Sequence, residues 1–327
     1  MMPVGLGHEA LDTVLIVNPN SCSGLTGKNW KELYAKIKKI FGRDIKVVFS
    51  KKQGDGTSLA RDYLRKGFSR VVAIGGDGTI NEVANGFFEE HSGIRGYKLR
   101  RINPDAIMGI VPCGTRNVLA KSVGLPAGVI ESCQNFVGGM PTKIDLIAVS
   151  ATNPDTDLRT PSRVFLNAAE IGLGAEIIDR SKRVRTKLKN RLVSTAAAII
   201  STVPSYESNL CDVFIDGRKK STNMTMGVIA NGKFLGGSFM AAPEASVVDG
   251  LLDLVIMKDS GSFKMLDELL SIKDGNYEKE NNILYAKAKK VVIKSNEREV
   301  TVTIDGEPVG ILPATFHVLP KALTIVI

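Results

Sequence analysis

A glycine-rich stretch around an aspartate offers the clearest chemistry in the sequence. Residues 75–79 read GGDGT and come directly after the apolar run 71–74. Glycines at the end of a buried strand let backbone N–H groups approach phosphate oxygens, and a following helix N-terminus adds positive potential. Asp77 is then placed to reach a metal ion or a sugar hydroxyl. The stretch is neither G-x-G-x-x-G nor a Walker A loop. Taken alone, it is explained equally well by a tight turn in which Asp77 caps a helix.

Three other polar stretches, 18–24, 50–60 and 112–117, each follow a short apolar run. The first is rich in small polar groups, and in the last Gly114 frees the backbone while Thr115 offers a hydroxyl. Each alone is compatible with an ordinary turn or helix cap. Because ligands of open α/β sheets bind at the carboxyl ends of the strands, we expect all four stretches to share one crevice.

The elements that position these stretches alternate along the first 145 residues, as is typical of parallel βαβ units in an open sheet. The patterns predict strands over 13–18, 44–50, 70–76 and 106–112, and helices over 28–41, 57–67, 79–89 and 115–124. From 142–150 onward, short β-like runs between turn residues predict an antiparallel sandwich or barrel. Helical segments at about 175–201 and 262–272 interrupt it, and the polar stretch 150–162 is expected to be a hairpin loop.

We therefore expect two domains. An N-terminal open α/β nucleotide-binding domain occupies 1–145, and a C-terminal antiparallel β-sandwich occupies 146–327, with its last residues able to pack back on the first domain.

The composition narrows the class of partner and the cellular compartment that we expect. The 327 residues carry a net charge of +9, which favours anionic partners without choosing among them. The four cysteines include no C-x-x-C pair, so neither a zinc site nor a disulfide framework is indicated and a reducing cytosol is expected. No apolar run is long enough to span a membrane, and the N-terminus lacks the pattern of a secretory signal.

Four segments in this order and spacing resemble the diacylglycerol kinase catalytic family, in particular its bacterial and archaeal lipid kinases, which are related to sphingosine kinases. They are VNPNS (17–21), GGDGTINEVANG (75–86), GIVPCGTRNVLAKSVGLP (109–126) and IDGE (304–307). GGDGT also occurs in NAD kinases, whereas its combination with PCGTRN and IDGE is more specific to lipid kinases. The resemblance covers nearly the whole chain and implies ATP- and magnesium-dependent phosphorylation of a lipid hydroxyl.

The resemblance also implies roles for single residues. Glu307 is the general base that takes the proton from the lipid hydroxyl, and the catalytic Mg²⁺ lies near Asp77, with Asp145 in a supporting network. Phosphoryl transfer mainly needs positioning, charge neutralisation and one proton acceptor. The implied nucleotide contacts are Asn18, Pro19, Asn20, Ser21, Cys22, Ser50, Gly75, Gly76, Asp77, Gly78, Thr79, Ile80, Asn81 and Thr115. From the residues alone, Asp305–Gly306 is a plain β-turn signal.

Residues 243–254 match a family loop that holds a structural Mg²⁺. The implied ligands are the backbone carbonyls of Ser246 and Leu251 and the carboxylate of Asp249. An oxygen-only site suits magnesium. The alternative is another Asp-Gly hairpin turn.

The chain departs from the family pattern at three places. Cys22 replaces a glycine of the first loop, which predicts a rearranged loop there. Val118 stands where many relatives have an acid, although sphingosine kinases also lack one. Residues 90–105 read as a longer loop than many relatives have.

Residues 180–191 contain seven basic side chains and precede the apolar stretch 192–203. A charge run is usually a solvated helix face, but in the family this region lies near the lipid entrance. We therefore expect a peripheral enzyme that docks on an anionic membrane surface from the cytoplasm.

Two alternatives stay open: an NAD kinase-like enzyme, and a catalytically silent lipid- or nucleotide-binding protein. Isolated histidines give hydrolase chemistry no support, and no aromatic-basic module indicates a nucleic-acid partner. The sequence does not name the lipid, and it leaves a homodimer open.

Overall fold

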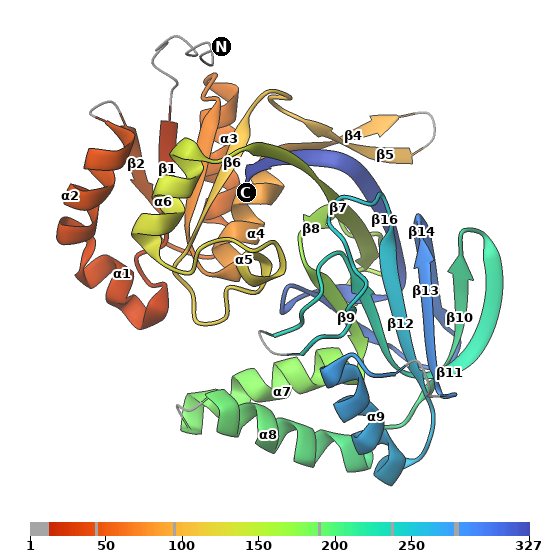
Figure 1. Cartoon of the computed structure of the whole chain (residues 1–327). Helices are drawn as coiled ribbons and strands as arrows, with labels where there is room; N and C mark the ends of the chain where they lie inside the picture. Colours follow the sequence, from red (N-terminus) through yellow and green to blue (C-terminus); the bar gives the residue numbers. More distant parts are fainter. Residues whose placement is uncertain (1–12, 43–44, 94–95, 189–190, 237–238, 278–280) are drawn as a thin grey trace, which may run out of the picture. The chain divides into compact units, whose positions relative to one another are not determined.

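A computed structural model describes residues 13–327 except 43–44, 94–95, 189–190, 237–238 and 278–280 (Figure 1). The chain divides into two compact units. Unit 1 consists of the chain up to Ala120, of Gly124–Lys143 and of Leu323–Ile327. Unit 2 consists of Lys121–Val123 and Ile144–Ala322.

Unit 1 is built on a parallel sheet in the order β2 (Ile45–Phe49), β1 (Thr13–Val17), β3 (Arg70–Gly75) and β6 (Ile107–Pro112). The end of β16 (Glu307–Val326) continues it, because Thr324 pairs with Ile107 in parallel. β1, β3 and β6 are buried apolar runs, as expected for strands covered on both faces.

Helices cover this sheet (Figure 1). Ile37 and Phe136 of two of them join one core cluster with strand residues such as Val72. The helices described in unit 1 are α1 (Leu25–Lys28), α2 (Trp30–Phe41), α3 (Asp55–Arg65), α4 (Asp77–Gly86) and α6 (Val129–Gly138), with the 3-10 turn η1 (Cys22–Gly24) before α1. α5 (Val118–Ser122) begins in unit 1 and ends in unit 2.

Two expectations for unit 1 were wrong. The helix expected over 79–89 ends at Gly86, and the loop expected at 90–105 is largely a hairpin of β4 (Phe88–Gly93) and β5 (Gly96–Arg101). Its strands carry charged residues without apolar alternation, so no periodic signal marks them. The hairpin is fixed at its base, where Arg61 donates to the carbonyl of Phe88 at 3.1 Å.

Six strands of unit 2 pair in a closed ring and form a barrel. They are β9 (Ala168–Gly172), β15 (Thr301–Ile304), β16, β14 (Lys290–Ser295), β10 (Asn209–Ile215) and β11 (Arg218–Ala230), which pairs with β9 again. β12 (Leu252–Lys258) and β13 (Ile283–Ala288) extend the sheet from β11, and β7 (Pro141–Thr152) and β8 (Arg163–Phe165) extend it from β16. The expected fold class, an α/β domain and an antiparallel all-β domain, is confirmed.

Helices lie together against one side of the barrel (Figure 1). The expected segment 175–201 is two helices, α7 (Leu173–Leu188) and α8 (Arg191–Thr202), and it is followed by η2 (Val203–Ser205) and α9 (Ser262–Asp274). Leu173, Val203 and Leu269 share a buried cluster with the barrel residue Val228. Within the part of the chain that is described, no helix is long and apolar enough to cross a membrane.

Candidate active site

The GGDGT stretch forms the turn from β3 into α4. Gly76 precedes the helix and Asp77 is its first residue. The first backbone bond of the helix runs from the N–H of Ile80 to the carbonyl of Gly76 at 3.0 Å. The preceding N–H groups of the first turn therefore have no intrahelical acceptor, which makes this end of α4 electropositive.

The carboxyl ends of the strands meet at one edge of the sheet, as expected. The N–H of Asn18 donates to the carbonyl of Ile74 at 3.0 Å, and that of Ser50 to Val17 at 2.9 Å. The N–H of Cys113 donates to the carbonyl of Gly75 at 2.7 Å. The four stretches singled out in the sequence thus follow neighbouring strands at this edge.

Glycine is required where two of these turns touch. A Cβ on Gly114 would lie 2.6 Å from the Cα of Gly76 and 2.7 Å from Oδ1 of Asn117. The backbone of the β6–α5 loop therefore lies directly on the β3–α4 turn. Both glycines serve this close packing, in addition to any approach of a ligand.

Asp77 connects the same two turns. Its Oδ1 accepts the N–H of Val118, the first residue of α5, at 2.6 Å. Burial raises the pKa of Asp77, whereas backbone N–H groups, those of Val118 and Leu119 foremost, and the charge of Arg116 oppose this. Asp77 does cap a helix, but that helix is α5 rather than α4. The loop after β6 thus presents the backbone N–H of Val118 to Asp77.

The loop after β1 is held by its own small polar groups. Asn18 Nδ2 donates to Thr79 Oγ1 at 2.9 Å, which ties the loop to α4. The Ser21 hydroxyl lies 2.8 Å from the carbonyl of Asn18 and 2.7 Å from Thr26 Oγ1, and Pro19 accepts the N–H of Gly27 at 2.9 Å. This compact loop places Asn20 and Cys22 at the surface.

Cys22 stands in the left-handed region, with φ of +52°, and Ser23 and Gly24 follow at +57° and +86°. Glycine adopts this conformation without cost, whereas another residue is strained by about 1–2 kcal/mol. The substitution of cysteine for glycine therefore stores local strain at the expected phosphate edge.

The residues predicted to contact the nucleotide differ in which of their groups could bind it. Thr115 is exposed, while Ile80 lies in the core and can contribute only its backbone. Asn81 is buried and accepts Asn85 Nδ2 at 2.9 Å. Gly75 packs against Thr79, so its place in the turn is also structural.

Sequence reasoning missed Glu82 on α4. Its carboxylate accepts the N–H groups of Gly54 at 2.8 Å and of Gly56 at 3.0 Å, at the start of α3. The N–H groups of Lys51 and Lys52 bind Asp55. The stretch 50–60 is thus a loop and helix cap whose donors are largely occupied by protein. Glu82 acts on residues 26 and 28 positions away, so no local spacing reveals it.

Asp145, Glu307 and the 243–254 loop belong to unit 2. The buried carboxylate of Asp145 accepts the N–H of Gly250 at 2.6 Å and of Lys321 at 2.7 Å. Its backbone N–H donates to Val247 at 2.6 Å. Asp145 is therefore the centre of a structural network that joins β7 to this loop and to the end of the barrel.

Glu307 begins β16 directly after a tight turn. Asp305 and Gly306 have φ of +46° and +83°, the pair of left-handed residues that a two-residue hairpin needs. The carboxylate of Asp305 accepts the N–H of Ala168 at 3.1 Å, and Lys182 on α7 donates to the carbonyl of Gly306. The Asp-Gly signal is indeed a hairpin turn, and it holds Glu307 on a rigid support.

Arg163 on β8 is the charged neighbour of Glu307. Its guanidinium lies 3.6 Å from Glu307 Oε2, and both side chains are partly exposed. Sequence reasoning missed Arg163, because the partners lie on separate strands.

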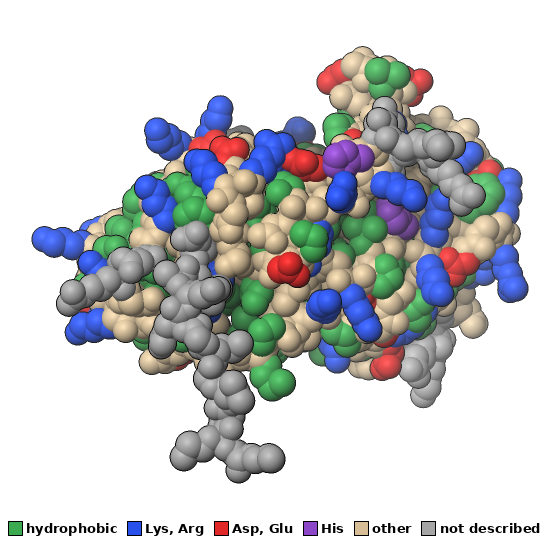
Figure 2. Space-filling view, turned by 90° about the horizontal axis from the view of Figure 1, so that it is seen from above, with side chains coloured by type: hydrophobic (Ala, Val, Ile, Leu, Met, Phe, Trp, Pro, Cys, Tyr) green, Lys and Arg blue, Asp and Glu red, His purple; other side chains and the backbone are tan. Residues whose placement is uncertain are grey.

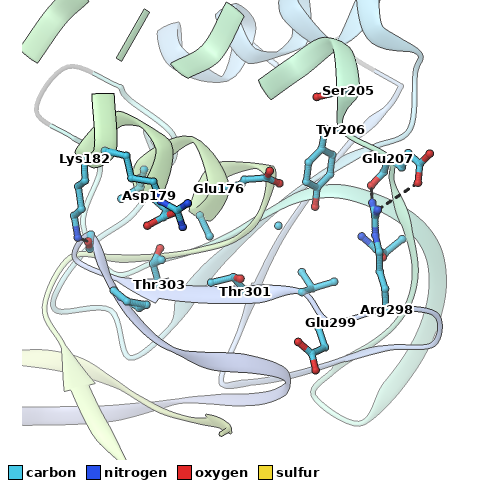
Figure 3. Close-up of a pocket in the computed structure, with 18 residues that line it drawn as sticks. Glu176, Asp179, Lys182, Ser205, Tyr206, Glu207, Arg298, Glu299, Thr301 and Thr303 are labelled. Atoms are coloured by element: carbon cyan, nitrogen blue, oxygen red, sulfur yellow. Dashed lines mark hydrogen bonds and ion pairs between the residues drawn. The ribbon is translucent and has the colours of Figure 1, made fainter. Parts of the chain in front are cut away.

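A cavity of about 470 Å³ adjoins this turn (Figure 3). Figure 3 shows α7 residues Glu176, Asp179 and Lys182 along one side and Thr301 and Thr303 of β15 along the other. Gly306 and Pro308, the residues that flank Glu307, also line it. Four of its charged groups form two ion pairs, Arg183 with Asp179 at 2.7 Å and Arg298 with Glu207 at 3.3 Å. The lining therefore mixes polar and apolar groups and is close to charge balance.

Tyr206 also lines the cavity (Figure 3). Burial raises its pKa to about 12, so its hydroxyl remains a hydrogen-bond donor at neutral pH.

Matches to two protein-domain families identify the class of protein. Residues 12–149 match the "Diacylglycerol kinase catalytic domain", and residues 168–327 match the "YegS C-terminal NAD kinase beta sandwich-like domain". The chain belongs to the diacylglycerol kinase catalytic-domain family and carries the YegS-type C-terminal domain, which confirms the resemblance seen in the sequence. Kinases of this family use ATP.

Individual relatives are distant but match along most of their length. The chain is 25% identical over 315 residues to a diacylglycerol kinase of Bacillus subtilis, covering 95% of both chains. It is 28% identical over 302 residues to a probable YegS-like lipid kinase of Chromohalobacter salexigens, covering 91% of this chain and 87% of that one.

Solved structures share the fold. A putative diacylglycerol kinase of Bacillus anthracis superposes with a TM-score of 0.74 at 23% identity, over 97% of this chain and 96% of that one. A yeast NADH kinase with bound NADH gives 0.52 at 14% identity, over 96% of this chain and 82% of that one.

Proposed function

We propose that this protein transfers the γ-phosphate of ATP to a hydroxyl group at the polar end of a membrane lipid. The observation that carries the proposal is Glu307, a partly exposed carboxylate on a pinned turn whose neighbours Gly306 and Pro308 line the cavity. A glutamate in this position can accept the proton that a lipid hydroxyl loses as it attacks phosphorus.

Unit 1 supplies the nucleotide site in this proposal. The start of α4 and the exposed Thr115 offer donors at one edge of the sheet, close to Asn18 and Ser50. Magnesium reaches kinases bound to the phosphates of ATP and needs only one or two protein carboxylates. The single carboxylate of Asp77 fits that requirement. Mg²⁺ bound there would neutralise charge on the transferring phosphoryl group.

The cavity in unit 2 fits the acceptor end of the lipid. Its paired charges, hydroxyls and phenol suit a head group that carries a hydroxyl, and its apolar side chains suit the carbon atoms next to that hydroxyl. We infer that the chains stay in the membrane while the head enters the cavity.

Exposed apolar side chains on α8 and α9 support docking on a membrane. Val193 and Ile200 on α8 are 50% and 73% exposed, and Leu266 and Leu270 on α9 are 45% and 48% exposed. Of the basic run, Arg180, Lys182 and Arg183 are described, whereas the side chains of 185–192 lie outside the described residues. We propose that apolar insertion and attraction to anionic lipid act together here.

The face seen in Figure 2 gives no support to a nucleic-acid partner. Figure 2 shows Lys and Arg side chains scattered over the visible face among acidic and apolar ones, without a continuous stripe. A groove that follows a nucleic-acid backbone needs such a stripe.

Phosphorylation of NAD is the second candidate, because the yeast NADH kinase shares the fold. The test is transfer from γ-labelled ATP to diacylglycerol, a sphingoid base, a glycerophospholipid and an archaeal-type ether lipid in mixed micelles, with NAD in a parallel reaction. The proposal predicts one labelled lipid and no labelled NAD. If NAD is the only labelled product, the NAD kinase hypothesis replaces this proposal. If ATP binds but no product is labelled, the result favours a silent binding protein.

A further inference from the structure

A lysine holds the loop that precedes β12. Lys287 on β13 directs its ammonium at two oxygens of this loop: Oδ2 of Asp249 and the carbonyl of Glu244, each at 2.9 Å. A third oxygen, Oδ1 of Asp253 on β12, lies 3.8 Å away. The ammonium therefore lies among oxygens in the way that a bound cation would.

The sheet fixes this placement. Lys287 pairs directly with Asp253 in the antiparallel register of β12 and β13.

The loop held by Lys287 in turn holds Asp145. The N–H of Gly250 donates to the Asp145 carboxylate, and the carbonyl of Val247 accepts the Asp145 N–H, both at 2.6 Å. Lys287 is therefore a positioning residue for the Asp145 network.

The residues around Asp249 do not fit a divalent cation while Lys287 occupies this place. Magnesium requires about six oxygens at roughly 2.0–2.1 Å in octahedral geometry. Both oxygens of Asp249 already accept donors, Oδ1 from the N–H of Leu251 at 3.0 Å and Oδ2 from Lys287. A divalent ion on this carboxylate would lie within a few ångströms of the ammonium and be repelled by it.

Asp253 offers the remaining oxygen, since its Oδ2 is buried and has no hydrogen-bond partner among the described residues. Tyr285 already donates to the other oxygen. At most one buried oxygen of Asp253 is therefore open to a cation.

We propose that the Lys287 ammonium takes the place of the structural divalent cation, so that the 243–254 loop of this protein needs no metal. The magnesium site predicted at Ser246, Asp249 and Leu251 is then absent as long as Lys287 is present.

Thermal unfolding of the full chain without nucleotide tests this, in EDTA and in millimolar Mg²⁺. Wild type is expected to keep the same Tm in both. Lys287→Met keeps the side-chain length without the charge, and we expect its Tm in EDTA to be lower by about 3–8 °C. Millimolar Mg²⁺ is expected to restore part of that loss, because Asp249 and the Glu244 carbonyl are then free.

Lys289→Met is the matched control, since this lysine is exposed and its side chain does not reach the loop oxygens described above. Its Tm should match wild type. A wild-type Tm that falls in EDTA, or a saturable rise with Mg²⁺, would overturn the proposal even if the Lys287 variant failed to fold. A Lys287→Met variant as stable as wild type in EDTA would also overturn it.

Discussion

Asp77 combines a structural contact with a proposed role in the reaction. Its Oδ1 caps α5 through Val118, yet burial disfavours its charge. Because the folded state raises the pKa, ionisation of Asp77 costs stability as pH rises above the ordinary value of 3.8. At neutral pH the charge on this carboxylate therefore destabilises the unliganded protein, and the proposed reaction is what would use that charge.

Asp77→Asn separates these two roles. The amide oxygen can still accept the N–H of Val118, so we expect an unchanged or higher free energy of unfolding in denaturant without nucleotide. Transfer to lipid should fall about 100-fold or more, since an electrostatic stabiliser is lost. A loss of more than about 2 kcal/mol of stability would instead show that the charged cap is the main role of Asp77.

At the scale of elements, the turn that contains Gly76 packs against the turn that contains Gly114. Gly114→Ala places a methyl group 2.6 Å from the Cα of Gly76, and neither backbone can yield cheaply. We expect a loss of about 1–3 kcal/mol of stability, together with weaker ATP binding by calorimetry. Gly138→Ala, in the last turn of α6 with no atom within 4 Å of the new Cβ, is the control and should be neutral or slightly stabilising. Equal effects of the two changes would contradict the close approach of the turns.

Protonation of His317 on β16 is expected to make the stability of the protein depend on pH. Burial, together with the charges of Lys290 and Arg159, lowers its pKa below 6.5, so the folded barrel holds it neutral. The unfolded chain then binds the proton more readily, and stability should fall as pH drops below about 6.5. Urea unfolding at several pH values should show this slope in wild type and a flatter one in His317→Gln. An unchanged slope in the variant would assign the pH dependence to other groups.

Helices and strands with a clear apolar pattern could be predicted from the sequence, and those without one could not. The apolar runs 13–17 and 71–74 are buried strands, and the Asp305–Gly306 signal is a hairpin turn. The β4–β5 hairpin and the division into α7 and α8 lacked a distinct signal. α6 was overlooked, although Val129, Cys133 and Phe136 stand at helical spacing. Closure of the barrel rests on the pairing of β9 with β15, strands more than 100 positions apart, and pairing at that distance leaves no local pattern.

The same reasoning explains which site residues were found. Asn18, Asp77 and Glu307 stand in recognisable segments, and the structure places each at a strand end or tight turn. Glu82, Arg163 and Lys287 were missed, because each acts on a partner far away in the chain. The roles of all the named residues in catalysis or nucleotide binding stay predictions.

At the scale of the whole molecule, the exposed apolar side chains of α8 and α9 predict membrane association. Ile200→Ser combined with Leu270→Ser should weaken sedimentation with anionic vesicles about tenfold or more. Binding should also fall as salt rises, because surface charge contributes. Met140→Ser, at a position 77% exposed in unit 1, is the control and should bind as wild type does. If the α8–α9 variant bound vesicles as strongly as wild type, this surface would have no role in membrane binding.

The central claim is that holding ATP and taking the proton from the lipid are separate tasks, and that Glu307 performs the second. The most direct measurement is phosphate transfer to lipid by wild type and Glu307→Gln at saturating ATP, with the ATP affinity of each measured by calorimetry. We predict that transfer falls about 100- to 10,000-fold in the variant, while ATP affinity stays within about twofold. Transfer that stays within tenfold of wild type would contradict the assignment of Glu307 as the base.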